Sequence, residues 1–274
     1  MQNTPKFPTA SSALEIFELI KTIPAEASIF LDVDDTIITP KSVTFRSPPF
    51  NQMLDRIKAN KSNYDNFEEM VSNWRLQRKV MLIDEKWVNV INKLKENHPV
   101  YALTQMNTGE FGNIPSVQEW RYNELKNLGI EFSGNEKLAI YNTAKKDDAV
   151  FYKGIFITGN HSKSGTLAKF VEGLQASFIV FVDDRKKHIE DVQDYCQKNN
   201  IGFLGILFDG LKNLSGEPDP KLAEFQELHL IENAEWLEDE AAYKLMKESN
   251  LFRLKNNLQL KLIKYNKNII ELII

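Results

Sequence analysis

The fold is decided by the stretch Ser28-Ile-Phe-Leu-Asp-Val-Asp-Asp-Thr36, where a short apolar run ends in three closely spaced carboxylates. Similar runs, rich in β-branched and aromatic residues, recur at 99–104, 154–158, 178–183 and 202–208. Segments with helical periodicity separate them, such as the one carrying Trp87, Ile91 and Leu94. Strands that alternate with helices are typical of a parallel sheet with crossover helices. The sequence therefore predicts an α/β fold built on a parallel sheet.

The composition is that of an ordinary globular chain. Of 274 residues, 42% are apolar and 26% are charged, which excludes a disordered, collagen-like or disulfide-stapled protein. The single cysteine, Cys196, fits a reducing compartment and lies on an apolar helical stripe with Ile189 and Val192, which favours a core position. The net charge of -4 argues against a nucleic-acid partner, because nucleic-acid binding normally needs a basic surface.

No targeting or membrane-spanning segment is recognisable. Residues 1–13 lack the apolar run of a secretory signal, and no stretch reaches the roughly 18 apolar residues of a transmembrane helix. We therefore expect the cytoplasm of the producing cell, while export by a route that leaves no N-terminal signal stays open.

Changes of pattern divide the chain into three parts. Residues 1–36 and 84–215 carry the strand–helix alternation and form the expected catalytic core. Residues 37–83 interrupt it with a Ser47-Pro-Pro49 turn and a polar helical stretch, and we interpret them as a small helical cap insertion. Residues 216–274 form a C-terminal helical extension, acidic and helical from 221 to 246.

Polar residues follow four of the predicted strands at their carboxyl ends, where open α/β sheets bind ligands. These residues are Asp32, Asp34, Thr104, Lys163, Asp183 and Asp184. So many carboxylates repel one another unless a cation neutralises them, and hard oxygen ligands suit Mg²⁺. The pattern predicts a magnesium site with one lysine and one hydroxyl beside it.

This set resembles the motifs of the haloacid dehalogenase superfamily of phosphohydrolases, which has a Rossmann-like parallel sheet. Asp32-Val-Asp34-Asp-Thr36 matches its first motif, Thr104 its second, Lys163 its third and Asp183-Asp184 its fourth, in the correct order. The overall layout is similar to a little-characterised bacterial branch of that superfamily. The resemblance implies a Mg²⁺-dependent phosphatase that hydrolyses a small phosphate monoester through an aspartyl phosphate.

The resemblance also assigns roles to the residues. Asp32 is the implied nucleophile, and Asp34 the implied general acid and base. Asp32, the Asp34 carbonyl and Asp183 are the implied Mg²⁺ ligands, with Asp184 assisting through water. Thr104 donates to a phosphoryl oxygen and Lys163 offsets negative charge, while Ser162 suits the N-cap of the helix that Lys163 begins.

Other functions compete with this one. A calcium EF-hand loop requires Gly where Ile37 lies and Glu where Val43 lies, and a glycosyltransferase DxD motif leaves Thr104 and Lys163 unexplained. A phosphotransferase or phosphomutase uses the same chemistry with another acceptor. A binding or effector protein on the same scaffold also stays open, because a fold does not imply a function.

Residues outside the motifs carry weaker expectations. Four aromatic residues of the insertion could line the mouth of the site, namely Phe50, Tyr64, Phe67 and Trp74, with Arg46 and Arg75 as anion contacts. The simpler interpretation is that the aromatic residues form the core of the insertion itself. A possible hairpin joins 138–141 to 150–153. We expect His161 and His188 at the surface or behind the motif residues. Arg185, Lys186 and Lys187 are expected in solvent, with contact to a substrate phosphate as the alternative.

The end of the chain is basic and amphipathic. Five basic residues and one acidic residue give residues 251–274 a charge of +4, so the rest of the chain carries -8. Its apolar residues follow helical spacing at Leu251, Leu254, Leu258, Leu262, Tyr265, Ile269 and Leu272. Docking on the chain's own acidic surface is the leading interpretation. A helix-mediated oligomer or partner comes second and an anionic membrane surface third.

Overall fold

The structure, a computed structural model, describes residues 7–141 and 146–249. The central sheet has seven strands, namely β1 (Thr9–Ala10), β2 (Ala27–Leu31), β5 (Val100–Thr104), β6 (Val150–Tyr152), β7 (Ile155–Ile157), β8 (Phe178–Asp183) and β9 (Gly202–Phe208). Their order is β1-β9-β8-β2-β5-β7-β6, and every pair is parallel except β6 with β7. The predicted α/β fold with a mostly parallel sheet is confirmed.

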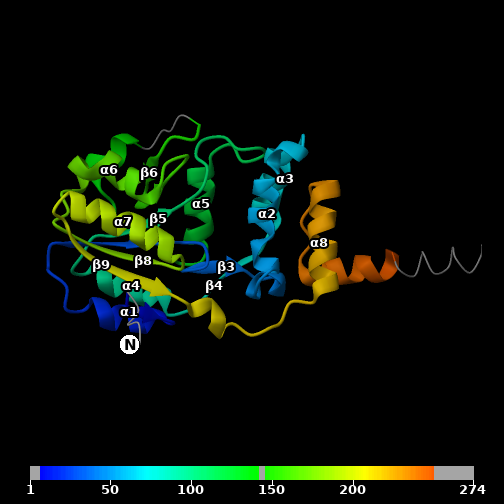
Figure 1. The fold of residues 1–274 in the computed structure, drawn as a ribbon, viewed down its shortest axis with the longest axis horizontal. Coiled ribbons are helices and arrows are strands. Elements are labelled where there is room, and N and C mark those ends of the chain that lie inside the picture. Colours follow the sequence, from blue (N-terminus) through cyan, green and yellow to red (C-terminus); the bar gives the residue numbers. More distant parts are fainter. Residues whose placement is uncertain (1–6, 142–145, 250–274) are drawn as a thin grey trace, which may run out of the picture.

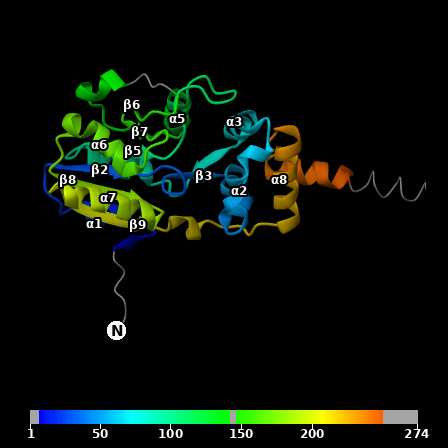
Figure 2. The same cartoon turned by 45° about the horizontal axis from the view of Figure 1, so that its top comes forward.

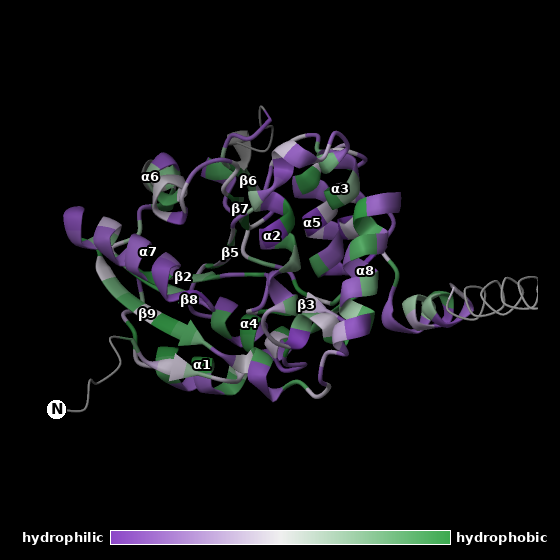
Figure 3. Cartoon of the chain, turned by 45° about the vertical axis from the view of Figure 1, so that its right-hand side comes forward, coloured by the Kyte–Doolittle hydropathy of each residue, from purple (hydrophilic) through white to green (hydrophobic). Residues whose placement is uncertain are grey.

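Helices cover both faces of this sheet (Figures 1 and 2). They are α1 (Ala13–Ile20), α4 (Trp87–Lys95), α5 (Val117–Lys126), α6 (Lys163–Leu174) and α7 (Lys186–Lys198). Alternate residues of β2 point to opposite faces: Ile29 belongs to the hydrophobic cluster that includes α1 and α4, and Phe30 to the cluster that includes α6 and α7. Figure 3 shows β9 as mainly hydrophobic and α7 as mainly hydrophilic. The central strands are therefore buried on both faces, as parallel strands usually are.

The insertion begins and ends with a strand pair that we did not predict. β3 (Ile38–Pro40) pairs antiparallel with β4 (Val80–Leu82). Between them lie η1 (Val43–Arg46), η2 (Phe50–Gln52), α2 (Met53–Ala59), η3 (Lys61–Asn63) and α3 (Phe67–Gln77). Strands of three residues, one containing Pro40, are too short to produce a readable alternation. The pair places the two ends of the insertion side by side at the edge where β2 ends.

The C-terminal extension packs against the insertion. After η5 (Gly210–Asn213), helix α8 (Pro220–Asn233) lies beside α2 and α3 (Figures 1 and 2). The buried Gln226 side chain accepts a hydrogen bond from the Thr44 hydroxyl at 2.6 Å and donates to the Leu237 carbonyl and the Asp239 carboxylate. Trp236 packs on Phe45 with ring centroids 5.6 Å apart. Insertion and extension therefore share one core.

Two predictions about local structure are wrong. The helix expected from 221 to 246 is interrupted, because Ala234 adopts the left-handed conformation (φ 51°) and a second helix occupies 239–249. The expected hairpin does not form. The segment 138–141 lies in η4 (Glu136–Tyr141), and β6 turns back onto β7 through Lys153 (φ 46°) and Gly154 (φ 88°). Positive φ at both turn residues is the requirement of a type I′ two-residue hairpin turn. The tail 251–274 lies outside the described residues.

Candidate functional site

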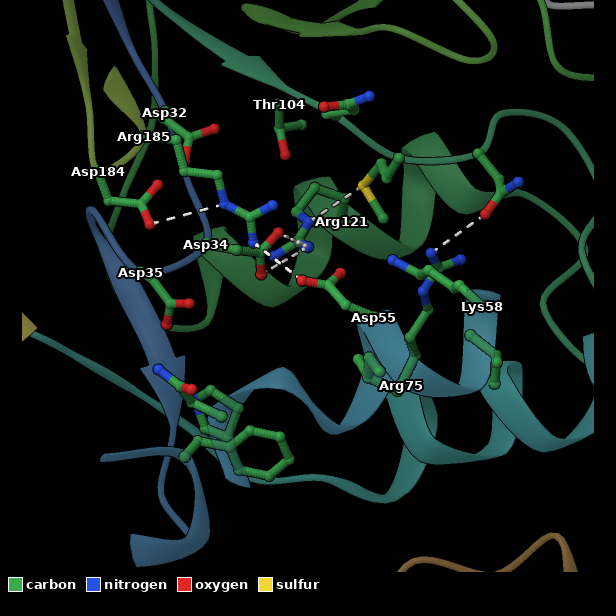
Figure 4. Close-up of a pocket in the computed structure, with 18 of the residues that line it drawn as sticks. Asp32, Asp34, Asp35, Asp55, Lys58, Arg75, Thr104, Arg121, Asp184 and Arg185 are labelled. Carbon is green, nitrogen blue, oxygen red and sulfur yellow. Dashed lines mark hydrogen bonds and ion pairs between the residues drawn. The ribbon is translucent and has the colours of Figure 1, made fainter. Parts of the chain in front are cut away.

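A cavity of about 460 Å³ opens where the insertion faces the carboxyl edge of the sheet (Figure 4). The sheet side of its wall includes Asp32, Asp34, Thr104 and Asp184, and the insertion contributes residues of α2 and α3 such as Arg75. Lys163 and Asp183 are buried behind this wall. The structure thus brings together all six residues that the sequence singled out.

Lys163 joins the ends of two neighbouring strands. From the start of α6, its ammonium donates to Asp32 Oδ1 and to Asp183 Oδ2, each at 2.5 Å. Ser162 caps this helix as predicted, since its Oγ accepts from the Gly165 amide at 3.0 Å. All three charged side chains are nearly inaccessible to solvent. A lysine buried in this way is held as a cation by its two carboxylate partners.

Asp183 makes contacts on each of its oxygens. In addition to Lys163, its carboxylate accepts from the Arg185 amide at 2.7 Å and lies 3.2 Å from His188 Nδ1. Although burial opposes it, the attraction of Lys163 and His188 lowers the pKa of Asp183. His188 therefore contacts a motif residue and also lines the cavity, whereas the exposed His161 pairs with Asp148 at 3.1 Å.

The acidic cluster is short of positive charge. One oxygen each of Asp32, Asp183 and Asp184 lies within 4.8 Å of the others. Burial, together with Asp183, raises the pKa of Asp32 to about 7 against the attraction of Lys163. Burial, together with Asp32 and Asp183, raises the pKa of Asp184 to about 9. A hard divalent cation relieves the repulsion between crowded carboxylates by binding their oxygens. These three residues therefore fit a Mg²⁺ ion.

Asp34 lies in a different electrostatic environment. Arg121 of α5 donates to both of its oxygens, at 2.7 and 3.0 Å, and Arg78 approaches it to 3.6 Å. Both arginines also pair with the half-buried Glu124. Burial raises the pKa of Asp34, but the attraction of Arg121 and Arg78 outweighs it and lowers the pKa to about 2. Asp34 is therefore ionised at neutral pH in this structure.

Sequence analysis missed Arg121, although a signal exists. Arg121 follows Val117 and precedes Leu125 at helical spacing, and all three are buried on one face of α5. A charged residue in the middle of an apolar stripe is rarely buried without a partner. This position was therefore identifiable as a buried cation, but nothing local in the sequence identified Asp34 as its partner.

The loop after β2 aims the first motif at the cavity. The Asp35 amide donates to the Ile38 carbonyl at 2.8 Å, and the Ile37 amide donates to the Val33 carbonyl at 2.9 Å. Asp35 has φ 61°, a left-handed conformation that aspartate tolerates better than most residues. The buried Thr36 hydroxyl lies 3.5 Å from Asp32 Oδ2. Thr104, at the end of β5, lines the cavity close to Asp32 (Figure 4).

The expectations for the cavity mouth are partly wrong. Arg75 and Trp74 do line the cavity. Arg46 does not, because its guanidinium donates to the Pro40 and Lys41 carbonyls at 2.9 Å. Phe50, Tyr64 and Phe67 are absent from the wall, and the latter two pack against the hydrophobic core, in line with the simpler interpretation.

The basic run after the acidic pair is exposed to solvent, as predicted. Lys186 is not part of the cavity wall and pairs with Glu190 at 3.9 Å. Arg185 and Lys187 are exposed and also line the opening of the cavity. Arg185 lies between Asp184, at 3.8 Å, and Asp55 of the insertion, at 3.9 Å, because the turn after β8 directs it across the opening (Figure 4).

Comparison with known proteins places the chain in a family. Residues 9–243 match the model of a family described as "Protein of unknown function (DUF2608)". The chain belongs to this family. It is similar to "Uncharacterized protein RP296" of Rickettsia prowazekii, with 30% identity over 250 residues covering 87% of this chain and 90% of that protein. No solved structure matches.

A more distant relative bears on location. The chain is 21% identical over 240 residues, 81% of its own length and 88% of the relative, to a Chlamydia trachomatis protein named "Putative outer membrane protein". Within the described ranges, none of the helices combines the length and the apolar composition that a membrane span requires. The expected cytoplasmic location stays a prediction.

Proposed function

We propose that this chain is a phosphohydrolase of the haloacid dehalogenase superfamily, with the Rossmann-like core of that group, and that it hydrolyses a phosphate monoester through an aspartyl phosphate on Asp32. The observation that carries the proposal is the convergence of Asp32, Lys163 and Asp183 through hydrogen bonds at the carboxyl edge of the sheet. Lys163 is 131 positions from Asp32 and 20 positions from Asp183 in the sequence, and the resemblance of the motifs implies that the three associate.

Asp32 is the nucleophile in this proposal. Lys163 holds Oδ1 at 2.5 Å, which leaves Oδ2 as the oxygen that attacks phosphorus while the substrate's ester oxygen departs with its bonding electrons. The same lysine offsets negative charge as the anionic nucleophile and phosphate approach each other. Thr104 lies close to Asp32 (Figure 4) and in this proposal donates a hydrogen bond to a phosphoryl oxygen.

Asp34 serves the second step. In that step water attacks the phosphorus of the aspartyl phosphate, the bond to Asp32 breaks, and Asp34 accepts the proton that water loses. The ionised state that Arg121 imposes on Asp34 suits this role. In the first step the departing oxygen needs a proton, so substrates whose leaving group is already acidic are the most favourable ones for a first test.

Mg²⁺ would be held by Asp32, Asp183 and Asp184, with the Asp34 carbonyl as the further ligand that the resemblance implies. When bound, it supplies positive charge that neutralises the carboxylates and the dianionic phosphate. The raised pKa values of Asp32 and Asp184 support this assignment, because they report a site that lacks such charge.

The test is the hydrolysis of p-nitrophenyl phosphate, whose leaving group needs little protonation. We expect nitrophenol release in Mg²⁺ and its loss in excess chelator, with recovery when Mg²⁺ is restored. Transfer of phosphate to an added alcohol instead of water would identify a phosphotransferase. No turnover of any phosphate ester in Mg²⁺ would contradict the proposal and favour a binding protein on this scaffold.

A further inference from the structure

The end of the cavity formed by α3 and α5 carries more positive than negative charge. Three arginines lie there, Arg75, Arg78 and Arg121, and their carboxylate neighbours are Asp34 and Glu124. Asp34 and Glu124 pair with Arg78 and Arg121. The excess charge belongs to Arg75, for which the described residues provide no ion pair.

Arg75 is buried without a counter-ion. Only 7% of the residue is exposed. Its Nη2 donates to the Asn107 amide oxygen at 3.2 Å, and its guanidinium lies 4.8 Å from the ring centre of Phe111. Its Nη1 is buried and has no hydrogen-bond partner in the described structure. Both contacts are with neutral groups, so neither compensates the cost of burying a full charge.

The electrostatics of Arg75 agree with this geometry. Burial, followed by repulsion from Arg121 and Arg78, lowers its pKa to about 10. An arginine remains a cation at neutral pH even so. Arg75 lines the cavity, and its Nη1 lacks a hydrogen-bond partner. A bound anion would satisfy such a buried cation through a charge-assisted hydrogen bond.

The position of Arg75 separates it from the transferred phosphate. Figure 4 shows Arg75 and Lys58 reaching the cavity from the insertion, on the side of Arg121 away from Asp32 and Asp184. Lys58 lines the same part of the cavity from α2, exposed at its rim, and makes no ion pair within the described ranges. Two cations therefore face the cavity away from the carboxylates proposed to hold Mg²⁺ and the reacting phosphate.

We propose that Arg75, assisted by Lys58, binds a second anionic group of the substrate, so that the substrate is a phosphate monoester carrying a carboxylate or a second phosphate. This inference rests on the proposed phosphatase function for the identity of the first group. Arg121 is less suited to bind the second anion, because Asp34 and Glu124 already occupy its donors.

Calorimetry with ligands that cannot be hydrolysed tests the subsite without catalysis. The probes are three series of alkyl phosphonates of increasing chain length in Mg²⁺, whose far end is a methyl group, a carboxylate or a second phosphonate. For wild type we expect the best anionic-ended probe to bind about tenfold to a hundredfold more tightly than its methyl-ended counterpart. Comparison of the carboxylate and phosphonate series identifies which anion the subsite prefers.

Arg75→Gln should abolish this difference while leaving the affinity for the methyl-ended probe within about twofold. Lys58→Gln should reduce the difference to a smaller extent, and it keeps the test informative because Lys58 is exposed and its replacement does not threaten folding. Lys61→Gln, an exposed lysine of η3, is the matched control and should change neither affinity.

Two outcomes overturn the subsite. One is equal affinity of wild type for methyl-ended and anionic-ended probes at every length. The other is an equal loss for both kinds of probe in Arg75→Gln, which would mean that Arg75 contacts the reacting phosphate itself. A preference for anionic ends without turnover of any phosphate ester would instead refute the phosphatase function and retain the subsite. Turnover of a phosphate ester without a preference for anionic ends would refute the subsite and retain the phosphatase function.

Discussion

Arg121 Nη2 donates to both carboxylate oxygens of Asp34, at 2.7 and 3.0 Å, although the two residues are 87 positions apart in the sequence. The pair fixes the second aspartate of the first motif to helix α5, so the motif is oriented by an element that the motif itself does not contain. The same guanidinium donates to Glu124 at 2.6 Å and is only 2% exposed. Arg121 therefore contributes to the stability of the fold and also sets the charge state of Asp34.

Arg121→Met should destabilise the protein. The substitution leaves Glu124 with Arg78 alone and removes the Nη2 group that contacts both oxygens of Asp34. Removing one partner of a largely buried ion pair such as Arg121–Glu124 costs about 3–5 kcal/mol. Urea unfolding followed by circular dichroism measures the loss. Arg121→Lys, which keeps the charge but not the fork of donors, should lose less. A stability unchanged in Arg121→Met would show that the pair contributes nothing to folding.

Asp184→Asn should separate metal binding from folding. Without metal its melting temperature should equal that of wild type, because a carboxyl group with a pKa of about 9 is already neutral at pH 7. Mg²⁺ at a hundred times its dissociation constant should stabilise wild type by about 2.7 kcal/mol. The variant should need much more Mg²⁺ for the same shift. Identical Mg²⁺ responses of the two proteins would count against Asp184 as a ligand.

Gln226→Leu tests the shared core of insertion and extension. The change deprives the buried Thr44 hydroxyl and the Leu237 carbonyl of the Gln226 side chain, whereas Asp239 keeps the Ser42 hydroxyl and the Val43 amide as donors. Each unsatisfied buried group costs about 1–3 kcal/mol. Denaturant unfolding should reveal a lower midpoint. Glu224→Ala, an exposed position on the same helix, serves as the control and should stay within about 0.5 kcal/mol of wild type.

Cys196 should resist alkylation in the folded protein. Burial raises the pKa of its thiol from an ordinary value of 9.0 to about 12, so the thiolate fraction at pH 8 falls by roughly 10³. Because the folded state binds this proton more strongly, the resulting stabilisation is present below pH 9 and is lost as the pH rises toward 12. Iodoacetamide labelling followed by mass spectrometry measures this. Labelling at equal rates in buffer and in urea would contradict a core position.

Sequence patterns predicted the sheet well because its strands are buried on both faces. β2, β5 and β8 are continuous apolar runs, each followed directly by polar residues, so both the strand and its functional end were visible. The same reasoning failed for β3 and β4, whose three residues carry too little pattern. It also failed for β6, whose partner depends on the turn at Lys153 and Gly154 and not on the apolar residues themselves.

Part of the candidate site was beyond prediction for a different reason. Asp32, Thr104 and Asp183 follow strands, and parallel strands deliver their carboxyl ends to one edge. Arg121 reaches the same cavity from a helix, and its direction depends on how α5 packs against the sheet and the insertion. Arg75 of α3 was considered from the sequence as an anion contact, and it does line the cavity. Arg46 was considered for the same role, and this prediction is wrong because its guanidinium donates to backbone carbonyls of its own segment.

The central claim is that Asp32 attacks phosphorus, and the most direct measurement compares Asp32→Asn with wild type in the hydrolysis of p-nitrophenyl phosphate in saturating Mg²⁺. Asp55→Asn, which removes a carboxylate from the insertion side of the same cavity, is the matched control. We predict that kcat of Asp32→Asn falls by about 10³ or more with the fold intact by circular dichroism, while Asp55→Asn stays within about threefold of wild type. Turnover by Asp32→Asn at the wild-type rate would contradict the account.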